Sequence, residues 1–347
     1  MKITFVVLTS PRIVGGIASN FYLANSLARL GHDVTVAHVD LFQFGVRAVA
    51  DISWFAFDER VQHRFVEQVD YGSFPDADFI FVMSTDDGVP PTRNGLPLIS
   101  IRGYGIYRKD SDERSYHAPY PKVVPARWLV DVGTRMGVPE QQLVLVPNGV
   151  DHEKYRLIRP MEGRGPIVAM VYRNHPTKGA VFGLEALAMV KSAVPEVEAV
   201  VFGQAEPRHD IAPWIVYRHD PPQPEIVDEI YNGSAVFLSS SVVEGFGKPC
   251  IEAMACGCAL VTTDNGGSRD YAIDGETALV SPPKDSRAMA TKIEILLQDQ
   301  ARRAGLAQRG SEYVKRFDWD TSAETLERFL IAYGEQPERL LGRADSR

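Results

Sequence analysis

The chain has 347 residues and only three cysteines. Cys256 and Cys258 flank Gly257, and Cys250 lies in the same predicted helix, so the spacing fits neither a disulfide framework nor a metal site. Burial as small packing residues is the expected role of all three. This cysteine usage is consistent with a reducing compartment and predicts a cytoplasmic location.

Long apolar runs and basic runs are also missing. The run Ile3–Leu8 is too short for a signal peptide or a membrane span, and no other segment approaches that length. A net charge of -8 without a basic run argues against a nucleic-acid partner. Most of the acidic excess follows residue 157, so the near-neutral first half leaves peripheral contact with an anionic inner membrane face open.

Buried-strand patterns alternate with helical patterns twice along the chain. The first series ends at the PNGVD turn, Pro147–Asp151, and the second begins at Ile167 after a polar linker. Such a sequence predicts an α/β protein with two Rossmann-like, doubly wound domains facing across a cleft. The predicted strands are Ile3–Leu8, Asp33–Val39, Asp78–Met83, Leu98–Ile101, Leu143–Val146, Ile167–Tyr172, Val197–Phe202, Ala235–Leu238 and Cys258–Thr263.

The predicted domains are residues 1–157 and 158–318. A capping box at Thr321 and Glu324 precedes apolar residues at helical spacing, which predicts a last helix over residues 319–335. The polar tail, residues 336–347, is predicted to be mobile.

The segment EGFGKPCIE, Glu244–Glu252, places two glutamates on either side of a glycine-rich turn that opens a short helix. Pro249 suits the first turn of that helix, and Gly257 suits its end. Gly245 and Gly247 let the backbone come close to a ligand. The N–H groups of Phe246, Gly247 and Lys248, together with the positive end of the helix dipole, would favour a phosphate there.

The two glutamates suggest contacts to the rest of a nucleotide sugar. Glu252 can accept hydrogen bonds from a vicinal diol such as a ribose, and Glu244 from a sugar ring. Glutamates near helix N-termini are also common for dipole reasons alone, so a solvated helix residue and a loop charge are the competing interpretation.

A second cluster follows the predicted strand Ile167–Tyr172. In VYRNHPTKG, Arg173 and Lys178 lie at the carboxyl end of the strand, where open α/β sheets bind ligands. Both are natural clamps for a diphosphate, although surface charges are the alternative. Preorganised cations at a leaving phosphate would lower the barrier to breaking its bond to a sugar.

Together these features resemble family 4 of the retaining GT-B glycosyltransferases, also described as glycosyl transferases group 1. The resemblance is carried by the Arg-x4-Lys-Gly loop, the Glu-x7-Glu segment, the PNGVD turn and the Gly15–Gly16 pair, in that family's order. It implies transfer of a sugar from a nucleoside-diphosphate donor to a hydroxyl acceptor, which can be a glycan, a lipid-linked molecule or a small molecule. It further implies that the first domain, residues 1–157, binds the acceptor and that the second, residues 158–318, binds the nucleotide. Retention at the anomeric carbon, no metal or other cofactor, and a last helix that packs back on the first domain are implied as well.

The resemblance also implies roles for particular residues. Arg173, Lys178 and Glu244 would be catalytic. The residues expected to bind substrate are Gly15, Gly16, Arg102, Gly245, Phe246, Gly247, Lys248 and Glu252.

Two other functions remain open at this point. One is a sugar-nucleotide-binding protein without transferase activity. The other is a nicotinamide-dependent oxidoreductase, because Gly15–Gly16 and then Asp40 after the second strand imitate a dinucleotide fingerprint. The second match is poor, since SPRIVGGIASN lacks the G-x-G-x-x-G pattern.

Arg102 departs from the resembled family, whose members usually carry a histidine there that touches the donor sugar. An arginine would suit a 6-deoxy sugar, a uronic acid or an acidic acceptor, or would serve as a structural ion-pair partner. The aromatic segment Leu41–Phe57 would form an acceptor groove, a membrane-contacting patch or an inward-packed helix. Asp86 and Asp87 would contact an acceptor hydroxyl or cap a loop.

Overall fold

The protein is described by a computed structural model covering residues 1–40, 43–71, 74, 76–83, 94–106, 108–207 and 211–341. Two compact units emerge from the contacts within the chain: residues 1–149 with 319–347, and residues 150–318. Asp86, Asp87, Leu41 and Phe42 lie outside the described residues. Among the described helices, none combines the length and the apolarity needed to cross a bilayer.

The first unit is built on a parallel sheet in the order β3-β2-β1-β4-β5-β6-β7. The central strands β1 and β4 carry apolar residues on both faces, which explains why the middle of the sheet is buried. Phe5 of β1 stacks on Phe81 of β4 with ring centroids 4.6 Å apart. The strands are β1 Lys2–Leu8, β2 Asp33–Val39, β3 Gln62–Val66, β4 Phe79–Val82, β5 Leu96–Ser100, β6 Lys122–Val124 and β7 Leu143–Leu145.

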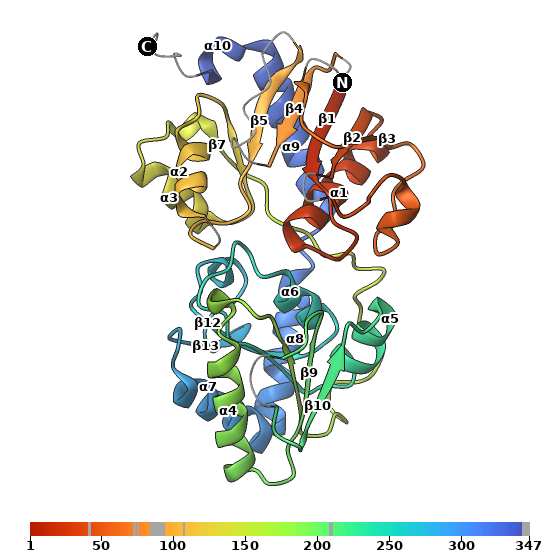
Figure 1. Cartoon of the computed structure of the whole chain (residues 1–347). Helices are drawn as coiled ribbons and strands as arrows, with labels where there is room; N and C mark the ends of the chain where they lie inside the picture. The colour runs from red at the N-terminus through yellow and green to blue at the C-terminus, as the bar shows by residue number, and fades with distance from the viewer. Residues whose placement is uncertain are drawn as a thin grey trace. The chain divides into compact units, whose positions relative to one another are not determined.

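Helices cover both faces of this sheet (Figure 1). The helix α1, Gly15–Arg29, is buried along Leu23, Ala24 and Leu27 and is followed by Gly31 at φ 91°, a left-handed conformation that favours glycine. The other helices are α2 Lys109–His117, α3 Arg127–Arg135, α9 Trp319–Glu335 and α10 Pro337–Leu340, with short 3-10 turns at η1 Val49–Ile52 and η4 Glu140–Gln142.

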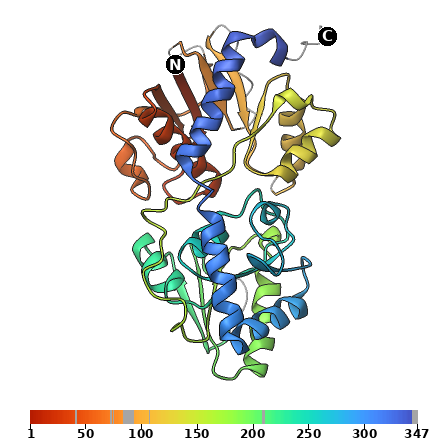
Figure 2. The same cartoon turned by 180° about the vertical axis from the view of Figure 1, so that it is seen from behind.

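The helix α9 returns the end of the chain to the first unit, as Figure 2 shows. Trp319 stacks on Tyr22 of α1 at 4.9 Å, and Tyr333 lies 5.8 Å from Phe79 of β4. The tail that follows is helical over Pro337–Leu340, where the carbonyl oxygen of Leu340 accepts a hydrogen bond from the Gln142 side chain at 2.7 Å.

The division between the units lies at Gly149, upstream of the boundary predicted at residue 157. The Val150 N–H donates to the carbonyl oxygen of Phe317, and the Ile158 N–H donates to the buried side chain of Asn232. Residues 150–158 therefore fold with the second unit, because their backbone partners lie there.

The aromatic segment after β2 packs mainly inward. The rings of Trp54, Phe55 and Phe57 lie 5.7, 5.2 and 4.7 Å from the ring of Phe21 in α1. Of the three interpretations left open for this segment, the inward-packed helix is replaced in residues 43–57 by a 3-10 turn, η1. Among the described aromatic residues of the segment, Phe44 differs, with 54% of its surface exposed.

The second unit has a parallel sheet in the order β10-β9-β8-β11-β12-β13. The strands are β8 Ile167–Val171, β9 Glu198–Gly203, β10 Ile215–His219, β11 Val236–Ser239, β12 Ala259–Thr263 and β13 Ala278–Ser281. Its helical segments are α4 Ala180–Ala193, α5 Gln223–Glu225, η6 Ile226–Tyr231, α6 Lys248–Ala255, α7 Ser286–Gln298 and α8 Gln300–Val314, with 3-10 turns at η5 Pro176–Lys178 and η7 Gly267–Asp270.

The strand order reverses direction between β8 and β11, which are hydrogen-bonded neighbours. The chain leaves β8 toward one flank of the sheet and β11 toward the other. A crevice between such diverging loops is where open α/β sheets bind ligands.

All three cysteines are buried and free, which confirms their packing role.

Candidate functional site

The entrance to α6 lies just after the loop that follows β11. Gly247 is the N-cap of α6 with φ 96°, and Pro249 lies in the first turn as predicted. A side chain at Gly247 would overlap the hydroxyl of Tyr271, so both the conformation and the space require glycine. The N-cap residue has no side chain with which to cap the helix, so the first N–H groups of α6 are not satisfied in that way.

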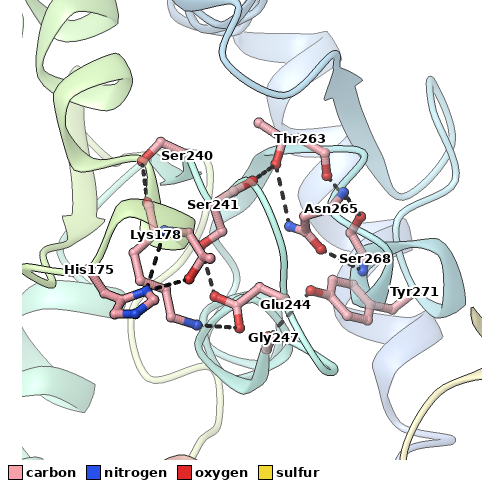
Figure 3. Close-up of polar contacts among 11 residues, drawn as sticks. His175, Lys178, Ser240, Ser241, Glu244, Gly247, Thr263, Asn265, Ser268 and Tyr271 are labelled. Atoms are coloured by element: carbon pink, nitrogen blue, oxygen red, sulfur yellow. Dashed lines mark hydrogen bonds and ion pairs between the residues drawn. The ribbon is translucent and has the colours of Figure 1, made fainter. Parts of the chain in front are cut away.

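The first glutamate of the motif is held by two side chains (Figure 3). The Lys178 Nζ lies 2.8 Å from Glu244 Oε2, and the Ser241 hydroxyl donates to Glu244 Oε1 at 2.8 Å. The Lys178 and Glu244 side chains are only 16% and 18% exposed. The structure thus brings together the lysine and the glutamate that two separate motifs predict to be catalytic.

The loop that carries Lys178 is built on the exit of β11. The Val242 N–H donates to the carbonyl oxygen of Thr177 at 2.7 Å, and the Ser240 hydroxyl donates to that of Lys178 at 3.3 Å. Gly179, at φ 59°, lies against Ser240, where any side chain would overlap the Ser240 carbonyl oxygen. His175 adds a 2.7 Å hydrogen bond between its Nδ1 and the Thr177 hydroxyl.

Sequence reasoning missed these supporting residues. The features of the sequence that could have indicated them are the Lys178–Gly179 pair and the serine run Ser239–Ser241, which follows a buried strand. Their importance depends on two loops 60 or more residues apart lying against each other, which no local pattern reports.

The loop after β12 holds the backbone of the glycine-rich turn through hydrogen bonds. Asn265 and Ser268 hold each other through the Ser268 N–H, which donates to Asn265 Oδ1 at 3.0 Å, and the Ser268 hydroxyl donates to the carbonyl oxygen of Thr263 at 2.8 Å. The Glu244 N–H donates to the carbonyl oxygen of Asn265 at 3.0 Å (Figure 3). This network positions the backbone of the glycine-rich turn. Phe246 is buried beneath it, 5.5 Å from the Tyr271 ring, so its side chain packs and only its backbone is available to a ligand.

The second glutamate faces a group of cations. Burial raises the pKa of Glu252, and the charges of Lys248, Lys154 and Arg173 act in the opposite direction. Arg173, in the loop after β8, and Glu252, in the helix α6, therefore share one electrostatic environment. Lys154, whose own pKa is lowered by burial, was missed by sequence reasoning. The feature of the sequence that could have indicated Lys154 is its position just after the PNGVD turn. Its backbone N–H donates to the Asp151 side chain.

In the first unit, the structure brings Gly16 and Arg102 together. A Cβ on Gly16 would lie 3.4 Å from the Arg102 Cβ. The Arg102 Nε donates to the Ser100 hydroxyl at 2.7 Å and Nη2 donates to Asn20 Oδ1 at 3.1 Å. Among the described residues no carboxylate pairs with Arg102, and its pKa is lowered by burial alone.

Asp40, the acid that imitated a dinucleotide fingerprint, has another role. Its carboxylate accepts hydrogen bonds from the N–H groups of Phe44, Gly45 and Val46 at 2.7, 2.7 and 3.1 Å. It therefore caps the loop after β2 and is not available to a ribose.

No group of three or more acidic, histidine or cysteine side chains suited to a metal occurs in the described parts of the chain.

Comparison with known proteins defines the class. Residues 151–313 match the family "Glycosyl transferases group 1". Among solved structures, sucrose-phosphate synthase from Thermosynechococcus elongatus has a TM-score of 0.74 at 18% identity, covering 95% of this chain and 99% of that one. Anabaena Alr3699/HepE, solved in complex with UDP-glucose, has a TM-score of 0.69 at 15% identity, covering 96% and 100%. The fold is thus that of the GT-B glycosyltransferases.

A sequence relative extends over nearly the whole chain. The phosphatidyl-myo-inositol mannosyltransferase of Mycolicibacterium smegmatis is 26% identical over 360 residues, which covers 92% of this chain and 90% of that protein. The resemblance predicted from the motifs is therefore confirmed, by the family over residues 151–313 and by this relative over nearly the whole chain.

Proposed function

We propose that the protein transfers a sugar, with retention at the anomeric carbon, from a nucleoside-diphosphate donor held in the second unit to a hydroxyl acceptor. The observation that carries this proposal is the Lys178–Glu244 pair, positioned by the loops after β8 and β11 where the strand order reverses. Support also comes from the neighbour solved with UDP-glucose and from the relative named as a mannosyltransferase.

The charges around the α6 entrance match a nucleoside diphosphate. Arg173, Lys178, Lys154 and Lys248 supply four positive charges, and Glu244, Glu252 and the Asp151 carboxylate beside Lys154 supply three negative ones. In the proposed complex the diphosphate lies at the N-terminal N–H groups of α6 and against Lys178 and Arg173. Cations that are already in place need no reorganisation as the leaving phosphate gains charge.

The proposed reaction breaks the bond between the anomeric carbon and the diphosphate oxygen and forms one to the acceptor oxygen. The acceptor proton passes to the leaving phosphate on the same face. Glu244, held by Lys178 and Ser241, accepts hydrogen bonds from the sugar hydroxyls, and Glu252 accepts those of the ribose. The cations, rather than a divalent ion, neutralise the leaving group.

The acceptor is proposed to lie on the first unit. The relative named for phosphatidyl-myo-inositol suggests a lipid-linked or glycan acceptor, with peripheral membrane contact at the inner face. Gly15 and Gly16 at the start of α1, with no acidic residue in the first turn, are proposed to approach the substrate phosphates.

A thermal-shift screen against nucleoside diphosphates and their sugars tests the donor class, followed by turnover of the stabilising donor with and without EDTA. Saturating donor should raise the melting temperature, since binding at a hundred times Kd stabilises by about 2.7 kcal/mol. Turnover should survive chelation. Donor binding without turnover on any glycan or lipid acceptor would favour the non-catalytic alternative, and loss of turnover in EDTA with rescue by magnesium would contradict the metal-free mechanism.

A further inference from the structure

A cavity of about 90 Å³ lies at the amino edge of the first sheet. Lys2, Asp33 and Gln62 are the first residues of β1, β2 and β3, and all three line it. These strands are neighbours in the sheet (Figure 1). Open α/β sheets bind their substrates at the opposite edge, beyond the carboxyl ends of the strands. The cavity is therefore separate from the places where a donor or an acceptor is expected.

Two buried threonines line this cavity. Thr4 of β1 and Thr35 of β2 are cross-strand partners and are only 2% and 8% exposed. Thr35 is also paired with Gln62 of β3, so the three side chains share one face of the sheet. Neither threonine hydroxyl has a hydrogen-bond partner among the described residues. Because a buried hydroxyl without a partner is costly, the two hydroxyls indicate a polar occupant of the cavity.

Other buried threonines of the chain show the usual arrangement. Thr9 and Thr277 are 2% and 5% exposed. Their hydroxyls donate to the carbonyl oxygens of Val7 and Tyr271 at 3.0 and 2.7 Å. Thr4 and Thr35 differ because their hydroxyls lie at the cavity and have no such acceptor within the described chain.

Two carboxylates and an amide complete the polar lining. Asp33 begins β2, and Asp76 lies in the loop before β4. The Gln62 amide nitrogen donates to Asp33 Oδ1 at 2.8 Å. This bond leaves the amide oxygen of Gln62 and the second carboxylate oxygen of Asp33 for another partner. Within the described chain, neither Asp33 nor Asp76 forms an ion pair with a cationic side chain.

The charges at the cavity favour a cation. Asp33 and Asp76 supply two negative charges, and Lys2 supplies one positive charge. Asp78, a further carboxylate close by, already accepts a hydrogen bond from the Lys2 backbone N–H at 2.7 Å. The acceptors that remain are carboxylate, hydroxyl and amide oxygens. Hard divalent cations prefer oxygen ligands of these kinds.

The size of the cavity also favours an ion. Pockets that enclose organic ligands usually measure about 300 to 1,000 Å³, far more than the 90 Å³ found here. A water molecule takes about 30 Å³ in the liquid, so the cavity has room for an ion with a few of its waters.

We propose that this cavity binds a hard divalent cation, Ca²⁺ or Mg²⁺. Its protein ligands are side-chain oxygens, those of Thr4, Asp33, Thr35, Gln62 and Asp76, and waters fill the remaining positions. The ion ties the edge strand β3 and the loop before β4 to β1 and β2, and it has no part in the proposed sugar transfer. Two carboxylates are few for such a site, which predicts a dissociation constant of about 0.1 to 1 mM.

The experiment titrates Ca²⁺ and, separately, Mg²⁺ into the full chain after treatment with EDTA and removal of the chelator. No nucleotide or sugar is present. Calorimetry measures the affinity, and thermal unfolding measures the melting temperature. Wild type is compared with Asp76→Asn and with Thr35→Val, which keeps the shape of the side chain and removes the hydroxyl oxygen. Asp131→Asn, which removes an exposed carboxylate of α3 in the same unit, is the matched control.

At least one of the two ions should bind wild type and raise its melting temperature. Asp76→Asn should weaken the affinity for that ion at least about tenfold, because one of two charged ligands is lost. Thr35→Val should weaken it at least about threefold, as loss of a neutral contact implies. The ion-free melting temperature of Thr35→Val should stay equal or rise, because the variant no longer buries an unpartnered hydroxyl. Asp131→Asn should change the affinity by less than about twofold.

Failure of both ions to bind wild type at about 10 mM, well above the expected dissociation constant, would overturn the proposal. Wild-type affinity in either Asp76→Asn or Thr35→Val would overturn it too, as would an equal loss in Asp131→Asn. Because no donor or acceptor enters these measurements, they remain valid if the proposed transferase activity is wrong. The two proposals therefore fail independently.

Discussion

Lys178 and Glu244 are 66 positions apart in the sequence, and their side chains form a 2.8 Å ion pair that is mostly shielded from solvent. The sequence motifs predict that each contacts the substrate by itself. The pair means instead that each side chain is held in place by the other before a donor binds. Substitution of either partner therefore changes the surroundings of the other.

The first prediction concerns this coupling. Lys178→Ala and Glu244→Gln should each lower kcat/KM more than tenfold, which corresponds to a loss of roughly 2 to 4 kcal/mol of transition-state stabilisation. The double variant should lose less than the sum, because either change already breaks the pair. Steady-state kinetics of the four proteins measure this. Lys315→Ala, which breaks the exposed pair with Glu312, is the control and should leave kcat/KM unchanged. Strict additivity would show that the pair has no catalytic meaning.

The second prediction separates the two glutamates. Glu252→Gln should weaken binding of the bare nucleoside diphosphate, since its carboxylate is proposed to hold the ribose, by about 1.5 to 3 kcal/mol. Glu244→Gln should affect the nucleotide-sugar more than the bare nucleotide. Calorimetric titration of both ligands into both variants tests the division. Equal losses for nucleotide and nucleotide-sugar in Glu244→Gln would place Glu244 away from the sugar.

The third prediction concerns Gly179, which links the Lys178 loop to β11. Gly179→Ala should destabilise the protein by roughly 2 to 4 kcal/mol, because the methyl group overlaps the Ser240 carbonyl in a left-handed conformation. Gly275, at φ 79° with nothing within 4 Å of the place that a Cβ would take, is a matched control in the same unit. Gly275→Ala should lower the free energy of unfolding only by the backbone strain, about 1 to 2 kcal/mol. Denaturant unfolding compares them, and equal losses would mean that the overlap relaxes freely.

The fourth prediction concerns Lys122, which is 1% exposed and donates to the carbonyl oxygen of Ala118 at 2.5 Å. Burial lowers the pKa of Lys122 from 10.5 to about 8. Between these values the unfolded chain binds a proton that the folded chain lacks, so stability should rise with pH across that window. The slope contributed by Lys122 is at most about 1.4 kcal/mol per pH unit.

Lys122→Met should remove this rise. The measurement is the free energy of unfolding of wild type minus that of the variant, followed from pH 8 to pH 10.5. Groups common to both proteins cancel in this difference. A difference that is flat with pH would show that Lys122 remains protonated in the folded chain.

Strong apolar strands were predictable from the sequence, and weakly patterned ones were not. The strand β2 has the predicted bounds, Asp33–Val39, because its apolar run is buried on both faces. The edge strands β3 and β10 were missed, since they carry exposed charged residues and gain their structure only by pairing with β2 and β9. The short strands β6 and β13, with three and four residues, were also missed.

The candidate site was predictable in its parts. The glycine-rich turn was recognisable because Gly247 must adopt φ 96° at the start of a helix that contains Pro249, and such constraints are local. Sequence also identified Lys178 and Glu244 in loops that follow buried strands, and Glu252 in the helix after the glycine-rich turn. Local pattern and chain direction therefore determined the fold class and predicted the position of the candidate site and the residue types within it.

Tertiary structure decided which of these residues meet and in what state. Only the pairing of β8 with β11 places Lys178 against Glu244, and only the folding of residues 150–158 onto the second unit brings Lys154 to Glu252. Burial then decided that Arg102, for which the sequence left several roles open, is a cation with no counter-charge among the described residues. Desolvation and pairing depend on neighbours brought together from distant segments, and those neighbours are set by packing rather than by local sequence.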